Sequence, residues 1–198
     1  DPLLESQSGR IQIELDEYEE LLDALEHGLP RTALKHALES FRLEPVYVRL
    51  ARLAEHAERL AERLDKGPIE VHIDAGKLRL AREPWNEFWS AAVHVLRNAV
   101  DHGLEERDER ARLGKLAPAR LELGARLGAE RFVVEIKDDG RGVDWEALAV
   151  RARAAGLPAA RRSDLIDAMF TSGVSTRASA SDVSGRGVGL DVLRAVCL

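Results

Sequence analysis

The sequence predicts an α+β fold that is preceded by a helical hairpin near the N-terminus. Three patterns lead to this expectation. Apolar residues recur every three to four positions over residues 14–66, which is typical of amphipathic helices. Apolar and polar residues alternate over residues 69–73, 120–126 and 131–137, as they do in half-buried strands. Between the first and second of these strands, residues 83–102 return to helical spacing.

The N-terminal segment predicts a polar leader, a short strand and two helices. Residues 11–15 alternate between apolar and polar and favour the strand. Asp16 is followed three residues later by a carboxylate, a pattern typical of a helix N-cap. Gly28 and Pro30 predict the end of this first helix and the start of a second one, which runs to about Phe41.

A third and longer helix is predicted over residues 46–64. Its apolar stripe is too short to establish a coiled coil, so two interpretations stay open. Either these helices pair with a second copy of the chain, or they pack only within it. The Gly67-Pro68 pair ends the helix and marks the predicted boundary between a helical segment that could dimerise, residues 1–66, and a second domain, residues 67–198.

The second domain is predicted to contain a strand hairpin followed by short helices. Gly128 joins the strands at 120–126 and 131–137, which lie close enough in sequence to pair. Helices are expected around residues 145–155 and 164–170, with Ser163 as the N-cap of the second one.

Composition narrows the classes of function. The 198 residues suit one large domain or a domain with an appendage, and an apolar fraction of 45% is ordinary for a globular protein. The net charge of −6 argues against a general binder of nucleic acid. The single cysteine excludes an internal disulfide and a cysteine metal cluster. Without a signal peptide or an apolar run of about 18 residues, we expect a cytoplasmic protein with no membrane span. The start at Asp1 suggests an excised fragment.

The helix at residues 83–102 gathers an unusual set of polar side chains. His94, Asn98, Asp101 and His102 fall within an arc of roughly 80–100° when the residues are placed at helical spacing. Asn, Asp and His are mediocre helix formers, so solubility alone does not account for them. An ordinary amphipathic surface helix stays open as the alternative. The opposite face is apolar and consists of Trp89, Ala92, Val93, Leu96, Ala99 and Val100.

Two glycine-bearing turns complement this helix face. Residues 185–189 carry glycine at alternate positions before a helix that begins at Asp191, an arrangement that favours an anion. The run lacks the Lys-Ser/Thr of a Walker A loop and the spacing of a dinucleotide-binding loop. Residues 138–142 place carboxylates and glycines directly after a strand, which suits a hydrogen bond to a flat base, although a plain β-turn is the alternative. Beside phosphates, the Asn98 carbonyl oxygen could complete the octahedron of Mg²⁺.

Four stretches together resemble the ATP-binding domain of CheA-type chemotaxis histidine kinases, which belong to the GHKL superfamily of gyrase, Hsp90 and MutL. They occur in the family's order within residues 67–198. The run from His94 to Gly103, which contains Arg-Asn-Ala-x-Asp-His-Gly, is similar to the N box. The other three are similar to the G1 box, the opening of the ATP lid and the G2 box, at residues 138–142, 170–177 and 184–192.

The resemblance implies a Bergerat fold, an α/β sandwich with a mixed sheet, that binds ATP and Mg²⁺. It implies that Asp138 bonds the adenine amino group, that Asn98 holds Mg²⁺ and that His94 accepts or orients a proton of the attacking histidine. Lys115, Arg177 and Arg186 are candidates to neutralise phosphate charge. The remaining nucleotide-binding candidates are Asp101, His102, Gly140, Gly142, Thr176, Arg177, Gly185, Gly187 and Gly189.

The chain departs from the family pattern at both ends. The last strands of the family fold are missing after Leu198, so we expect a domain truncated at its C-terminus. No phosphoacceptor motif surrounds His36 or His56, so the phosphorylated histidine is expected on a separate phosphotransfer domain, with a response regulator downstream. A receptor or coupling protein and a second copy of the chain are further expected partners. Two alternatives stay open, a nucleotide-binding regulatory module without kinase activity and a serine kinase of the anti-sigma-factor type.

Overall fold

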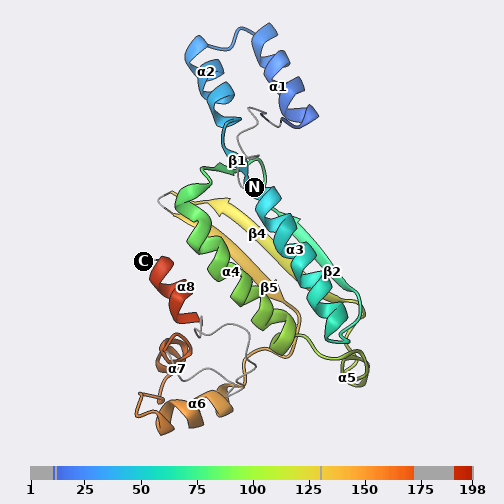
Figure 1. Ribbon diagram of the computed structural model, residues 1–198, viewed down its shortest axis with the longest axis vertical. Helices are drawn as coiled ribbons and strands as arrows, with labels where there is room; N and C mark the ends of the chain where they lie inside the picture. The colour runs from blue at the N-terminus through green and yellow to red at the C-terminus, as the bar shows by residue number, and fades with distance from the viewer. Residues whose placement is uncertain (1–10, 12, 130, 172–189, 198) are drawn as a thin grey trace, which may run out of the picture.

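The computed structural model describes residues 11, 13–129, 131–171 and 190–197. Figure 1 shows a sheet covered by two long helices, with a helical hairpin at one end and short helices near the other. The hairpin consists of α1 (Leu15–Glu26) and α2 (Arg31–Ser40). Across the described part of the chain, no helix combines the length and the apolar character that crossing a membrane requires.

The sheet is mixed and contains three strands in the order β2-β4-β5. β2 (Ile69–Asp74) runs parallel to β4 (Ala119–Leu127), and β4 runs antiparallel to β5 (Phe132–Asp138). The predicted strand hairpin is therefore confirmed, and so is the α+β class with a mixed sheet. A separate two-stranded ladder joins β1 (Glu44–Pro45) to β3 (Arg79–Leu80) in antiparallel register.

One face of the sheet is apolar and the other is charged, because the strands alternate. Leu121 and Leu123 of β4 are buried against α3 (Val46–Arg63) and α4 (Asn86–Asn98). The opposite face carries exposed ion pairs between neighbouring strands, such as Glu122 with Lys137 at 2.9 Å. The molecule is thus a two-layer sandwich of helices on a sheet (Figure 1).

Helix α3 packs within the chain. Its buried stripe belongs to the same apolar core as α4 and the sheet, so this helix follows the intrachain interpretation. Dimerisation stays open for α1 and α2, neither of which contains a buried residue. The domain boundary at residue 67 stays a prediction. Helix α3 lies before this boundary, yet it packs in the same apolar core as the strands and helix that lie after it. The buried residues of α3 are Val46, Leu50, Leu53, Ala54, Ala57, Leu60 and Ala61.

Two details of the N-terminal segment differ from expectation. The strand predicted at residues 11–15 is wrong, because α1 begins at Leu15 and the described residues before it form no strand. The N-cap is Glu14 and not Asp16; the Glu14 carboxylate and that of Glu17 make a reciprocal capping box. Glu is uncommon at an N-cap and Asp is common there. The prediction therefore selected Asp16, although Glu14 is also followed by a carboxylate three residues later.

The second half of the chain holds the shorter helices. Ser163 is not a cap, because α7 (Arg162–Met169) has Arg161 at its N-cap and the Asp164 carboxylate accepts the N–H of Arg161 at 2.9 Å. This helix packs on α6 (Trp145–Ala154) in a small apolar cluster of its own. The remaining elements are a 3-10 turn (Glu83–Trp85), a π-helical turn (Ala99–Gly103), α5 (Arg107–Arg112) and α8 (Leu190–Val196).

Candidate functional site

Helix α4 sorts its side chains as the spacing predicted. Its apolar face is buried in the main core, whereas His94 is half-buried and Asn98 is exposed on another side of the helix. Asp101 and His102 follow one turn later, and their side chains lie 3.7 Å apart between Oδ1 and Nδ1. Both are partly exposed, so α4 and the turn after it present an amide, a carboxylate and two imidazoles that a ligand could reach.

The polar end of this helix is a π-helical turn, which the sequence did not predict. The N–H of Leu104 donates to the carbonyl of Ala99 at 2.9 Å, a bond across five residues. Two carbonyls in and after this turn, those of Asp101 and Leu104, accept from the Lys66 ammonium at 2.5 and 2.7 Å. Burial is the main reason that the pKa of Lys66 is lowered. Such turns are frequent at functional sites, and here a lysine from the α3–β2 loop holds it.

The Asp138 turn meets the end of this helix directly. Asp138 ends β5, and its Oδ1 accepts the N–H of Gly140 at 3.0 Å. The N–H of Arg141 donates to the carbonyl of Gly103 at 2.8 Å. Two motifs that lie more than 30 residues apart in sequence are thereby joined by a backbone hydrogen bond.

Close packing explains why glycine occupies positions 103 and 140. A Cβ atom on Gly140 would lie 2.0 Å from the Gly103 carbonyl oxygen, and one on Gly103 would lie 3.0 Å from Asp138 Oδ1. A side chain at either position would push the two motifs apart. Gly142 has a different requirement, because its φ of +72° is a conformation that side chains disfavour.

A charged cluster lies beside this turn and was not found from the sequence. The Glu105 cluster, as we name it, consists of Glu105, Arg110, Lys115 and Asp139. Arg110 contacts the carboxylates of both Glu105 and Asp139, and its Nε donates to the Leu116 carbonyl at 2.6 Å. Glu105 is fully buried and Arg110 is 4% exposed. The sequence predicted no role for Glu105 or Arg110, and no local pattern indicates that these two charged side chains are buried.

Lys115 completes the Glu105 cluster with hydrogen bonds. Its ammonium donates to Glu105 Oε1 at 2.6 Å and to the carbonyls of Asp139 and Gly140 at 2.8 and 2.9 Å. Burial raises the pKa of Glu105, but hydrogen bonds from Lys115 and the other partners outweigh it and leave the pKa below its ordinary value. The pKa of Asp139 is lowered in the same way. Burial raises this pKa, but the hydrogen bonds from the Arg120 backbone N–H and from Arg110, together with the nearby positive charges, outweigh the effect of burial.

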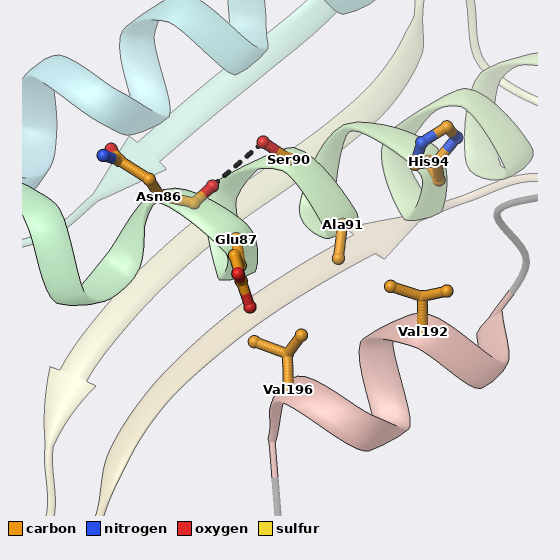
Figure 2. Close-up of a pocket in the computed structure, with 7 residues that line it drawn as sticks. All are labelled: Asn86, Glu87, Ser90, Ala91, His94, Val192 and Val196. Carbon is orange, nitrogen blue, oxygen red and sulfur yellow. Dashed lines mark hydrogen bonds between the residues drawn. The ribbon is translucent and has the colours of Figure 1, made fainter. Parts of the chain in front are cut away.

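His94 faces a pocket between α4 and α8. Figure 2 shows Val192 and Val196 pointing from α8 toward α4, where Ala91 and His94 line the opposite wall. The pocket measures about 360 Å³. Helix α8 (Leu190–Val196) packs on α4, and its Val192 lines the same pocket as His94.

Several predicted site residues lie outside the described residues. They are Thr176, Arg177, Gly185, Arg186, Gly187 and Gly189. Within the described ranges, no group of three or more His, Cys, Asp or Glu side chains is placed to hold a metal. Metal binding through Asn98 therefore stays a prediction.

Comparison with known proteins identifies the family. Residues 90–198 match the family of histidine kinase-, DNA gyrase B- and HSP90-like ATPases, and the chain belongs to it. Within this family the chain is of the CheA type, as the four motifs predicted.

Three relatives illustrate the likeness. A gliding motility regulatory protein of Myxococcus xanthus is 36% identical over 64% of this chain and 17% of its own length. The chemotaxis protein CheA of Listeria monocytogenes is 33% identical over 81% of this chain, and that of Halobacterium salinarum is 31% identical over 91%. The chain spans only 27% of each CheA protein.

Proposed function

We propose that this chain is the catalytic core of an ATP-dependent protein-histidine kinase, which transfers the γ-phosphate of ATP to a histidine on a separate phosphotransfer domain. The observation that carries the proposal is the placement of the Asp138 carboxylate. This carboxylate accepts the Gly140 N–H and packs against Gly103, at the end of the π-helical turn that follows α4. Membership of the ATPase family supports the nucleotide, and the CheA-type relatives support the acceptor.

The geometry around Asp138 suits an adenine ring. Oδ1 is occupied by the Gly140 N–H, and no described residue donates to Oδ2. This second oxygen can therefore accept a hydrogen bond from an amino group. Because Oδ1 is tethered, the carboxylate loses little freedom when it binds, which favours recognition of one amino group in one orientation.

The other proposed roles follow from the placement of the side chains. When bound, ATP supplies the phosphoryl group and Mg²⁺ offsets phosphate charge. Asn98 offers the exposed amide oxygen that Mg²⁺ accepts as a ligand, and the partly exposed Asp101 and His102 follow it in the π-helical turn. His94 presents a half-buried imidazole beside α8, where it would accept or orient the proton of an incoming histidine.

We also propose that α1 and α2 pair with a second copy of the chain. Their apolar side chains include Leu22, Leu25 and Leu38, which remain 43–49% exposed. Two more helices with the same pattern would bury them in a four-helix bundle. A response regulator and a receptor or coupling protein complete the proposed set of partners in the cytoplasm.

Transfer of radiolabel from ATP to a CheA-type phosphotransfer domain tests the kinase proposal. We expect an acid-labile phosphoprotein, because phosphohistidine is lost in acid. Asp138→Asn should abolish the transfer by weakening ATP binding, whereas Asp74→Asn, at the exposed end of β2, serves as the matched control. Nucleotide binding without transfer would favour a regulatory module, and an acid-stable product would favour a serine kinase.

A further inference from the structure

Lys115 uses every hydrogen bond that its ammonium can donate. An ammonium has three N–H groups, and Lys115 directs them to Glu105 Oε1 and to the carbonyls of Asp139 and Gly140. No N–H is left for a phosphate oxygen in this arrangement. Its role therefore differs from the charge neutralisation that sequence reasoning suggested.

The two carbonyls belong to two successive peptide groups that shape the site. A peptide group is planar, and its C=O and N–H point in opposite directions. By holding the Asp139 carbonyl, Lys115 directs the Gly140 N–H toward Asp138 Oδ1. The Gly140 carbonyl likewise fixes the next peptide, whose Arg141 N–H reaches the Gly103 carbonyl.

We propose that Lys115 is a positioning residue that aims the Asp138 carboxylate at the adenine amino group. It does so by fixing the two peptides after Asp138, and the buried carboxylate of Glu105 holds it in place. This inference rests on the proposed function, since it assigns to Lys115 a part in recognition of the same nucleotide.

Glu105 makes the arrangement rigid. Its carboxylate is fully buried and cannot touch a nucleotide, yet Lys115 and Arg110 both bind it. Arg110 also binds the Asp139 carboxylate, whose Oδ1 accepts the Arg120 N–H at 3.0 Å. The Asp139 N–H also donates to the Arg120 carbonyl at 3.2 Å, so the turn is held by Lys115 on one side and by Arg120 of β4 on the other.

Two nucleotides separate positioning from direct contact with phosphate. ATP carries the amino group that Asp138 would bind, and purine riboside triphosphate lacks it but has the same phosphates. We expect Lys115→Met to weaken ATP binding at least about tenfold, the loss expected for one charge-assisted hydrogen bond, and to leave purine riboside triphosphate nearly unchanged. Lys137→Met, which removes an exposed lysine from the charged face of the sheet, should change neither.

Glu105→Gln provides a second variant in case Lys115→Met does not fold. Positioning predicts the same selective loss of ATP affinity in this variant, because Gln holds the ammonium less firmly. If Lys115 instead contacted phosphate, Glu105→Gln would leave ATP affinity unchanged or raise it. Calorimetric titration of the protein with each nucleotide measures both effects, and thermal unfolding shows that each variant is folded.

The outcomes distinguish this inference from the proposed function. Equal losses for both nucleotides in the Lys115→Met variant would overturn the positioning role while the proposed function stands. Unmutated protein that binds neither nucleotide would overturn both.

Discussion

Helices α1 and α3 come from similar sequence patterns but have opposite surroundings. Both are amphipathic, and α1 has no buried residue, whereas α3 buries seven. The difference arises because the stripe of α3 faces the apolar side of the sheet, whereas α1 lies beside α2 in the hairpin, at the end of the molecule and away from the sheet (Figure 1). Helical spacing therefore predicts that an element is amphipathic, but not which surface covers its apolar face.

The two regions are also held by different forces. Apolar packing joins α3 to the sheet, whereas ion pairs join α1 to β3. Arg79 binds the Glu17 carboxylate at 2.5 Å and stacks over the Phe41 ring at 5.2 Å from its centroid. Burial raises the pKa of Glu17, but the hydrogen bonds from Arg79 and from the Glu14 N–H, together with the positive charge of Arg79, outweigh it and leave the pKa below its ordinary value. Salt should weaken the exposed contacts of Lys77 to Asp16 and Glu20 in the hairpin more than the apolar packing of α3.

The largest expected effect contrasts one leucine from each region. Leu50 of α3 is 0% exposed, so Leu50→Ala should lower the free energy of unfolding by about 2–5 kcal/mol. Leu22 of α1 is 43% exposed, so in dilute protein the matched Leu22→Ala should cost within about 0.5 kcal/mol. Urea denaturation measures both free energies.

Sedimentation of the same two variants tests the proposed pairing of the hairpin. Leu22→Ala should weaken self-association, because it removes apolar surface from the proposed interface. Equal stability losses at Leu50 and Leu22 in monomeric protein would contradict the contrast between the two regions.

The close approach of Gly140 to Gly103 predicts a steric effect of substitution. Gly140→Ala places a Cβ 2.0 Å from the Gly103 carbonyl oxygen and should cost about 1–3 kcal/mol of stability as the turn shifts. ATP affinity should fall with it, since Asp138 shifts too. Gly124→Ala is the control, because its Cβ would meet Glu135 Cβ at an ordinary 3.7 Å. Calorimetric titration and thermal unfolding compare the two variants, and similar behaviour would contradict the packing role of Gly140.

The Glu105 cluster predicts that the free energy of unfolding depends on pH in the acid range. The folded pKa values of Glu105 and Asp139 lie below their ordinary values of 4.5 and 3.8. Their stabilisation is therefore fully present above about pH 4.5 and is lost as the pH falls through the folded pKa values. Glu105→Gln should lower stability at pH 7 by about 1–3 kcal/mol and flatten the acid limb of the profile. Urea unfolding at a series of pH values measures this, and an unchanged acid limb would contradict it.

The smallest expected effect concerns the ion pairs of the hairpin. Arg79→Met should cost about 1 kcal/mol and increase amide hydrogen exchange in α1, because Arg79 and Glu17 are nearly buried. Lys77→Met removes exposed contacts to Asp16 and Glu20 and should leave exchange almost unchanged. Hydrogen exchange read by mass spectrometry compares them. If both variants behaved alike, the nearly buried pair would not be what anchors the hairpin.

The sequence by itself determined the local elements and the chemistry of the candidate site. Periodicity predicted α3, the strands β2, β4 and β5, and the two faces of α4, because burial of one face leaves a repeating pattern in the chain. The four motifs likewise predicted the family, since they depend on residue type and order.

Only the tertiary structure decided which surfaces meet. The parallel pairing of β2 with β4, the packing of Gly140 on Gly103 and the use of Lys115 within the Glu105 cluster all join residues that are distant in sequence. A fully solvated lysine and one that binds a buried carboxylate, as Lys115 does, have the same sequence signature here, because the partners of a charged side chain are supplied by the fold. Local pattern therefore predicted which residues could act, and long-range contact decided what each of them holds.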